Sequence, residues 1–362
     1  EYLIALADLP VTPLTIFFFN DTATTEIYTT FDADDAALIK AIETTGAAGY
    51  PATNHDVKAI EYFLRERLPA DLAIAEWIHF GLTSEDVNNL AHRVLLKGAV
   101  SEVLRPAIAD IRETLASMAV TYRELPMLAR THGQPATPTT FGKELAVFAS
   151  RLDRGLDRTD AAVNDLAGKL AGASGTYAAH HAAYPSVDWS AFAREFIADL
   201  GLDHAPLTTQ VNPCDDLGAL FDAVVGINTI LVDLDRDIWL YVSDRYLGQA
   251  TRGEETGSST MPHKVNPIDF ENSEGNLSKA NADLRFLADY VRTSRLQRDL
   301  SDSTVKRNIG PALAHCLLGY VKTADGLATV APNEPVLRAD LANNPAVVAE
   351  ALQTILRREG RS

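Results

Sequence analysis

The sequence predicts an all-α protein with a long central helix bundle and smaller helical domains at its N- and C-terminal ends. Long stripes of apolar residues recur at spacings of three and four, no strand-rich stretch interrupts them, and no repeat of 20–50 residues is present. The stripe in Asp215–Tyr241 is the clearest, because this spacing places its side chains on one helix face. It consists of Leu217, Leu220, Phe221, Val224, Ile227, Leu231, Leu234 and Ile238.

Three further stripes support the same architecture. They cover roughly Asp86–Tyr122, Thr139–Leu170 and Asn272–Arg295. Each exceeds the mean globular helix of about 11–12 residues, which favours a bundle of long helices. We place domain boundaries near residues 74 and 327, giving a partial N-terminal domain (1–74), the bundle (75–327) and a truncated C-terminal domain (328–362). We expect Asp215 or Asp216 to cap the helix that follows.

Composition is that of an ordinary globular chain. Of 362 residues, 46% are hydrophobic and 22% charged, and no apolar run reaches the roughly 18 residues of a membrane helix. The first residues carry no basic signal-peptide region, and the lack of Met there and the polar end suggest a fragment at both ends. Cys214 and Cys316 fit no disulfide framework or zinc site, so we expect two buried thiols and a cytoplasmic protein.

The net charge of −17 excludes a general nucleic-acid-binding surface, which needs a basic face. An anionic substrate would therefore need local Lys and Arg side chains and helix N-termini that act against the overall field.

The segment Ile16–Thr29 does not fit the helical pattern. It is rich in Phe, Thr and Ile, shows no helical period and resembles translated sequencing-adapter sequence. The alternative is an edge hairpin of a small domain. We expect artefactual sequence here and give the segment no functional weight.

The loop Gly248–Pro267 carries the densest chemistry. Glycines precede Ser258 and Ser259, and Lys264 and Asn266 follow before a helix that we expect from about Ile268. A glycine-rich loop with serines beside a lysine suits an active-site lid. A solvated linker is the alternative, but linkers rarely carry so many functional side chains.

Two other polar motifs lie at turns. In Arg130–Pro138, His132 precedes a glycine between prolines, which indicates a rigid turn before a helix; a packing histidine is the alternative. In Thr53–Phe63, a polar triplet opens an amphipathic helix, and Asn54 or Asp56 could cap it.

Two helix-associated clusters complete the set. Phe80–Asn89 contains Thr83 and Ser84 followed by two acids, a pattern typical of a helix N-terminus. Ser294–Asn308 is the densest basic group, and its interleaved hydroxyls suit phosphate binding; a solvated helix face is the alternative. Its basic residues are Arg295, Arg298, Lys306 and Arg307.

Several of these motifs resemble one known family. Gly257–Pro267, GSSTMPHKVNP, resembles the signature of the fumarase/aspartase superfamily, and the continuation IDFENSEGN is similar to its adenylosuccinate lyase branch. The resemblance covers most of Asn54–Arg358, with the motifs in the same order.

The resemblance implies a fumarase/aspartase-like fold and the elimination of fumarate from adenylosuccinate and from the succinylated aminoimidazole carboxamide ribotide. It implies that Ser258 is the base and that His132 is the proton donor. It implies no metal or organic cofactor, no nucleic-acid or membrane partner, and a homotetramer with sites shared between subunits. The implied substrate-binding residues are Asn54, His55, Asp56, Thr83, Ser84, Gln210, Ser259, Lys264, Val265, Asn266, Asn272, Arg298, Ser303, Thr304 and Arg307.

Alternatives remain open at this point. Another superfamily member, above all a carboxymuconate cycloisomerase, can also carry a histidine at position 263, but its substrate has no phosphate for the basic cluster. A catalytically inactive structural homologue is a second alternative, against which the complete set of motif residues argues. His180 and His181 lack a third ligand at a suitable spacing, so we expect no metal site.

Overall fold

The computed structural model describes residues 2–7, 9, 31–68, 73–250 and 265–361. The chain divides into two compact units. Unit 1 comprises Glu1–Lys97, Asn164–Cys214 and Thr293–Leu300; unit 2 comprises Gly98–Val163, Asp215–Arg292 and Ser301–Ser362. The three-part division at residues 74 and 327 stays a prediction. The segment Ile16–Thr29 lies outside the described residues.

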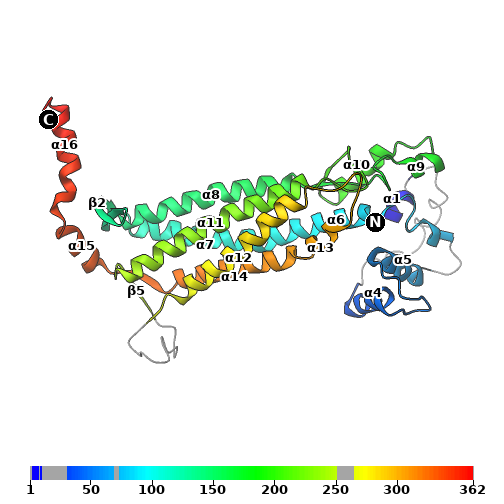
Figure 1. The fold of residues 1–362 in the computed structure, drawn as a ribbon, viewed down its shortest axis with the longest axis horizontal. Helices are drawn as coiled ribbons and strands as arrows, with labels where there is room; N and C mark the ends of the chain where they lie inside the picture. Colours follow the sequence, from blue (N-terminus) through cyan, green and yellow to red (C-terminus); the bar gives the residue numbers. More distant parts are fainter. Residues whose placement is uncertain (1, 8, 10–30, 69–72, 251–264, 362) are drawn as a thin grey trace. The chain divides into compact units, whose positions relative to one another are not determined.

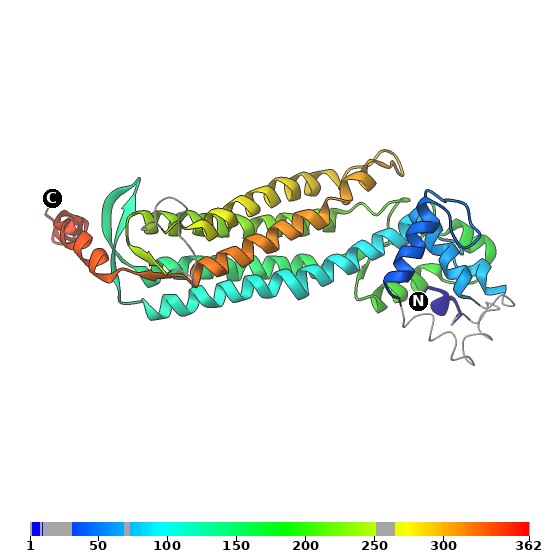
Figure 2. The same cartoon turned by 90° about the horizontal axis from the view of Figure 1, so that it is seen from below.

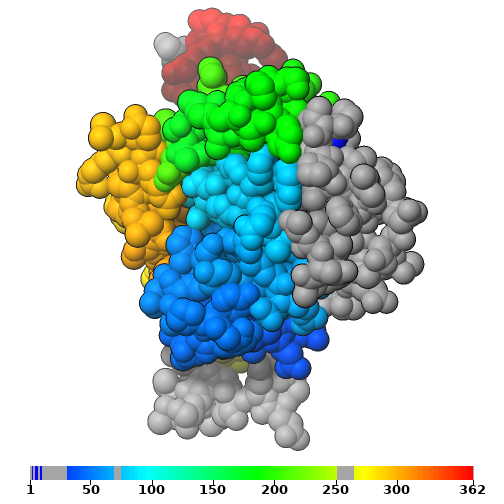
Figure 3. Space-filling model, turned by 90° about the vertical axis from the view of Figure 1, so that its right-hand side faces the viewer, coloured from blue at the N-terminus to red at the C-terminus, as the bar shows by residue number. Residues whose placement is uncertain are grey.

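Unit 1 is a set of short helices. Its elements are α1 (Tyr2–Ala7), α4 (Ala33–Thr44), α5 (Asp56–Arg67), the 3-10 helix η1 (Ala73–Trp77), α6 (Ser84–Gly98), β3 (Ala167–Gly168), α9 (Ala178–Ala183), α10 (Trp189–Asp199) and β4 (Asp203–His204). Helices α4 and α5 pair around Ile42, Ala59 and Phe63, and their outer surface is the blue area of Figure 3. Strands β3 and β4 pair in parallel, so the chain just before Lys169 is held against the segment that follows α10.

Unit 2 is a bundle of long helices (Figures 1 and 2). Its elements are the π-helix η2 (Ala99–Leu104), α7 (Arg105–Thr121), β1 (Pro126–Thr131), β2 (Gln134–Thr140), α8 (Phe141–Asn164), α11 (Asp215–Ser243), β5 (Leu247–Gln249), α12 (Ile268–Tyr290), α13 (Ser301–Lys306), α14 (Ile309–Leu327), β6 (Val330–Pro332), α15 (Glu334–Ala342), the 3-10 helix η3 (Pro345–Val348) and α16 (Ala349–Arg358). The two short antiparallel pairs are β1 with β2 and β5 with β6. These elements confirm the predicted all-α fold built on long helices.

Helix α11 is the core helix of unit 2. All eight residues of its predicted apolar stripe are buried, because α12 and other bundle helices pack against it. Within the described residues, α11 is the one helix long and apolar enough to pass a length and composition test for a membrane span, yet 56% of its apolar window is buried inside the structure. Asp215 and Asp216 lie inside its first turn, so neither is the capping residue. Their negative charges there interact favourably with the positive end of the helix dipole.

Buried polar side chains join the bundle helices at two levels. Asn228 on α11 donates to Asn281 of α12 at 3.0 Å, and Tyr320 of α14 donates to Asn228 at 2.6 Å. About two turns further along α11, Thr323 donates to the buried carboxylate of Asp235 at 3.2 Å. Both cysteines are buried and free, as the sequence predicts.

Candidate functional site

Unit 1 brings together side chains from two predicted motifs. The Ser84 hydroxyl lies 3.3 Å from Nε2 of His55, although 29 residues separate them. Both side chains are partly accessible. The polar triplet and the start of α6 therefore form one surface, as a shared substrate-binding role requires.

The triplet adopts a conformation that the capping prediction did not foresee. His55, rather than Asn54 or Asp56, caps α5, because its Nδ1 accepts from the Lys58 amide at 3.4 Å. Asn54 cannot cap the helix, since its φ of 50° lies in the left-handed region and a cap needs an extended backbone. Nδ1 also lies 3.3 Å from the Asp56 carboxylate, so the ring tautomer decides whether Nε2 donates to the Ser84 hydroxyl or accepts from it.

The start of α6 is a helix N-terminus, as predicted. The Asp86 carboxylate accepts from the Thr83 amide at 2.8 Å, which is the backward half of a capping box. Ser84 is the first helical residue. Its hydroxyl and the positive end of the helix dipole are suited to hold a carboxylate.

Two further segments of unit 1 reach the same helix start. Arg298 donates to the buried Glu85 carboxylate at 3.3 Å, and the Thr209 hydroxyl donates to the Gln297 carbonyl at 2.9 Å. Gln210, next to Thr209, donates to the Ala173 carbonyl at 3.0 Å. The predicted Gln210 and Arg298 thus lie on neighbouring segments of one unit, although 88 residues separate them in sequence.

His132 lies in unit 2, at the tip of a hairpin. The two central residues of the β1–β2 turn, His132 and Gly133, have φ of 56° and 75°, as a type I′ turn requires, and Thr131 pairs with Gln134 across it. The predicted turn is present, but strand β2 follows it directly, and the helix α8 begins only at Phe141. The turn holds the imidazole outward on an exposed residue, where it can reach a partner molecule.

A cavity of about 500 Å³ lies beside this hairpin within unit 2. Its walls include Glu144, Asp237 and Asp244, and burial together with Asp233 and Glu144 raises the pKa of Asp237. Three carboxyl groups repel a dianion, so this cavity is a poor site for an anionic substrate.

The remaining predicted site residues that the structure describes lie on or next to α12 and α13 of unit 2. Val265 and Asn266 precede α12, and Asn272 is exposed in its second turn. Ser303, Thr304 and Arg307 lie on or directly after α13 and are at least partly exposed. Lys306 does not fit the predicted phosphate-binding cluster. It is buried and donates to Asp302 at 2.7 Å, so its ammonium group is already paired.

Helix α14 separates Arg307 from His132 in a single chain. Arg307 precedes the start of α14, whereas β1 packs against α15 beyond the end of α14. At 1.5 Å per residue, the 19 residues of α14 span roughly 28 Å. Figures 1 and 2 both show α13 and β2 at opposite ends of the unit 2 bundle. One small substrate cannot contact both side chains of the same chain.

Ser258, Ser259 and Lys264 lie outside the described residues. In the part of the chain that is described, no three His, Cys, Asp or Glu side chains converge as a metal site would require. His180 is buried against the ring of Trp189, at 4.8 Å between centroids, and burial lowers its pKa. Its neighbour His181 is exposed.

Sequence reasoning missed Lys169, which is completely buried and pairs with Asp86 at 2.7 Å. A lysine in a polar-looking turn is ordinarily solvated. A weak signal was available, since Asp86 is the fourth residue of the Thr83–Asp86 capping motif and its second oxygen needs a partner.

Family comparisons cover most of the chain. A family model described as "Lyase" matches residues 21–281, and one described as "Adenylosuccinate lyase C-terminal" matches residues 294–362. The adenylosuccinate lyase of Escherichia coli (strain K12) is 48% identical over 92% of this chain and 72% of its own length. That of Dictyostelium discoideum is 47% identical over the same shares.

Two solved structures share the fold. The fumarate lyase from Mesorhizobium sp. BNC1 has a TM-score of 0.75 at 19% identity and covers 98% of this chain and 77% of its own. The beta-carboxy-cis,cis-muconate cycloisomerase from Acinetobacter calcoaceticus sp. ADP1 has a TM-score of 0.73 at 22% identity, covering 99% and 77%. At these identities the likeness concerns the fold alone.

Proposed function

Since the chain belongs to the adenylosuccinate lyase family, we propose that it eliminates fumarate from adenylosuccinate, giving AMP, and from the succinylated aminoimidazole carboxamide ribotide. The motifs predict this function, and relatives at 47–48% identity confirm it over the alternatives. In the structure, the observation that carries the proposal is the meeting of Ser84 with His55 and of Arg298 with Glu85 at one helix start.

The elimination breaks a C–N bond β to a carboxylate. A base removes the proton from the carbon beside the carboxylate, the electron pair forms the double bond of fumarate, and an acid protonates the departing nitrogen. The carbanion is spread over the carboxylate as a dianion, which needs cations and hydrogen-bond donors.

Ser258 is the proposed base. An ordinary serine is too weak for this step, so a nearby Lys264 must favour the alkoxide. Ser259 and Asn266, together with Lys264, are proposed to hold the dianion. These roles rest on the sequence motif, since three of the four residues lie outside the described part of the chain.

His132 is the proposed acid. An imidazole can give and recover a proton near neutral pH, as this step requires. The hairpin supports this role, because its turn presents the exposed ring outward with its backbone fixed by the Thr131–Gln134 pair.

The substrate's anionic groups are proposed to bind at two helix starts. Thr83 and Ser84 would hold a carboxylate, with His55 and Gln210 beside it. Arg298 of unit 1 would hold the phosphate, since guanidinium groups bind phosphate oxygens in pairs. Ser303, Thr304 and Arg307 of unit 2 keep the phosphate-binding role that the sequence motif implies, from this chain or from another copy. These local cations are required because the chain as a whole carries a charge of −17.

A homotetramer with shared sites is part of the proposal. The roughly 28 Å of α14 between Arg307 and His132 supports it, because the two can serve one substrate only from different copies. Exposed apolar side chains on the bundle, among them Phe286, Leu318 and Val321, support subunit contacts. Cytoplasmic localisation is proposed from the two buried free thiols.

An absorbance assay with adenylosuccinate tests the function. We expect the chain to release AMP and fumarate without added metal. Replacing Ser258 by Ala should lower kcat by at least about 100-fold, the lower range for removing an acid–base group. Near-normal turnover by this variant would exclude Ser258 as the base, and no turnover by the unaltered chain would exclude the function.

A further inference from the structure

Lys169 lies in the interior of unit 1, directly after β3. Its Nζ donates to Oδ1 of Asp86 at 2.7 Å and to the Gly172 carbonyl at 2.8 Å, and both charged side chains are 0% exposed. Its backbone is clasped by Asn89, which donates to the Lys169 carbonyl and accepts from the Lys169 amide, each at 2.8 Å. A lysine held at both ends in this way has one fixed position.

Asp86 connects Lys169 to two separate backbone segments. One carboxylate oxygen accepts from the Thr83 amide at 2.8 Å and from the Gly172 amide at 3.1 Å. The other accepts from the Ala171 amide at 2.9 Å as well as from Lys169. A single carboxylate thus ties the Thr83–Ser84 turn to the loop at residues 171–175.

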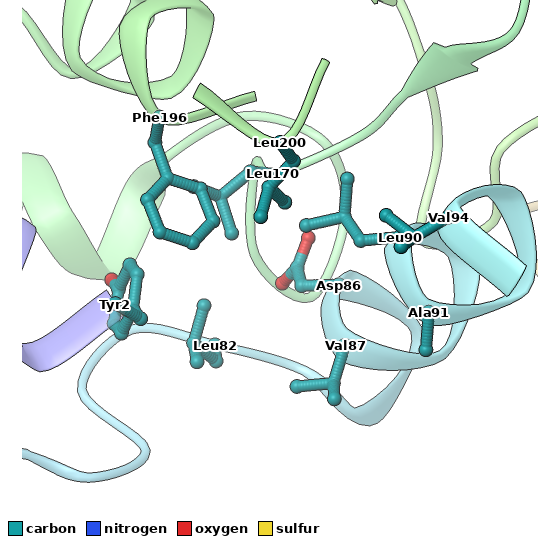
Figure 4. A pocket seen from close by; sticks show the side chains of 10 residues that line it. All are labelled: Tyr2, Leu82, Asp86, Val87, Leu90, Ala91, Val94, Leu170, Phe196 and Leu200. Carbon is teal, nitrogen blue, oxygen red and sulfur yellow. The ribbon is translucent and has the colours of Figure 1, made fainter. Parts of the chain in front are cut away.

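Beyond these polar partners, apolar side chains line the cavity beside the carboxylate. Figure 4 shows it among Leu82, Leu90 and Leu170, on the wall of a cavity of about 370 Å³ in unit 1. Burial lowers the pKa of Lys169, and the nearby Asp86 opposes that effect. Without the ammonium group the carboxylate would keep its three amide donors but lose its opposite charge, which is disfavoured in a buried site and favours a shift of the turn or the loop.

The loop at residues 171–175 connects the position of Lys169 and Asp86 to that of Gln210. Ala173, next to Gly172, accepts the Gln210 amide at 3.0 Å. Gly172 and Gly175 have φ of 75° and 73°, and a Cβ at Gly175 would lie 2.2 Å from the Thr208 carbonyl oxygen. The loop is therefore packed closely against the segment that carries Gln210, and a shift of one moves the other.

We infer that Lys169 is a positioning residue, which through Asp86 holds the Thr83–Ser84 turn and the Gln210 side chain in the register that binds substrate. This role rests on the proposed function. Lys169 itself contacts no substrate, because it is completely buried. Losing it should weaken ground-state and transition-state binding alike, which raises KM and leaves kcat nearly unchanged.

The test is Lys169→Met, which keeps the length of the side chain and removes its charge. We expect KM for adenylosuccinate to rise about tenfold, with kcat within about threefold of the unaltered chain. Ile197→Ala is the control, since Ile197 is buried in the core of unit 1. It should lower the melting temperature at least as much and leave KM unchanged.

A Lys169→Met protein with a lowered melting temperature and the original KM would overturn the inference and leave Lys169 as a stabilising residue only. If that variant does not fold, Lys169→Gln decides, because it removes the charge that pairs with Asp86 and keeps a hydrogen-bond donor for the Gly172 carbonyl; we expect a KM rise of about threefold, and an unchanged KM overturns the inference. Turnover by the unaltered chain tests the proposed function separately, and its absence would overturn both.

Discussion

Arg130 on β1 donates to the carboxylate of Asp340 on α15 at 2.6 Å, across 210 residues of sequence. Tyr246 joins them, since its hydroxyl lies 3.3 Å from Arg130 and donates to Asp340. Arg130 lies two residues before His132, so this cluster fixes β1 next to the turn that presents the proposed acid.

Replacing Asp340 by Ala should loosen that hairpin. The ion pair is about three-quarters buried on the Asp340 side, and two donors lose their acceptor, so we expect a loss of about 1 kcal/mol in the free energy of unfolding. Because His132 is displaced with the strand, kcat should fall about three- to tenfold. Urea titration and the adenylosuccinate assay measure the two effects.

Asp160→Ala is the matched control, since it removes the exposed partner of Arg105 elsewhere in unit 2. An exposed pair of this kind contributes little, so neither stability nor kcat should change measurably. Equal effects from both variants would contradict a special role for the Asp340 pair.

His132→Asn tests the proposed acid without disturbing the turn. Asparagine tolerates the left-handed backbone that His132 adopts with a φ of 56°, whereas alanine would strain it. We expect kcat to fall at least about 100-fold. The denaturation midpoint should stay unchanged, because the side chain is exposed.

The control for this variant is His181→Asn, which alters an exposed histidine of unit 1 outside the proposed site. It should keep full kcat. A His132→Asn chain that turns over substrate at the original rate would remove His132 from the mechanism.

The helices could be predicted from the sequence, because their signal is local. The stripe of α11 needs only its own residues, and the helical run from Ser84 to Thr121 follows the predicted Asp86–Tyr122. The β1–β2 hairpin could not, since Pro135 and Pro138 weaken any strand pattern. Its one local signal is the His132–Gly133 pair, which suits a two-residue turn.

The sequence predicts a list of candidate site residues, which stays a prediction, but it does not predict the contacts between them. The Glu85–Arg298 pair spans 213 residues, and the Lys169–Asp86 pair joins residues that no local pattern connects. The burial of Lys306 shows the same limit: an alternating basic and hydroxyl pattern predicts phosphate binding, but Asp302 on the same helix captures one of the cations.

The buried Asp235 predicts a pH-dependent stability. Burial raises its pKa to about 7, against the effect of the hydroxyl groups of Ser273 and Thr323 and with some contribution from Glu274. Between the ordinary pKa near 4 and about pH 7 the folded state therefore binds more protons than the unfolded state, and stability falls as pH rises through this window. Asp235→Asn should match the original protein near pH 4 and exceed it above pH 7, as measured by denaturant midpoints.

Asp222→Asn is the control on the same helix, since Asp222 is half exposed and pairs with Arg292. It should give no gain at high pH. If Asp235→Asn showed the same pH dependence as the original protein, another group would govern the titration.

The phosphate role of Arg298 predicts a selective binding defect. Arg298→Gln should raise KM for adenylosuccinate at least about tenfold, because a charge-assisted contact to phosphate contributes more than 1 kcal/mol. The rise should be small for a phosphate-free analogue. Arg295→Gln, three residues earlier and exposed beside Asp299, should change neither. Equal effects of Arg298→Gln on both substrates would contradict phosphate binding.

Mixing two inactive variants tests the shared site. The length of α14 keeps His132 and Arg307 of one chain apart, so each complete site would draw them from different copies. His132→Asn and Arg307→Gln chains should each be nearly inactive alone. After joint unfolding and refolding, mixed oligomers contain some sites with neither change, and a substantial fraction of the original activity should return. Mixtures that stay as inactive as their components, although both variants co-assemble by mass spectrometry, would place the two residues in separate sites.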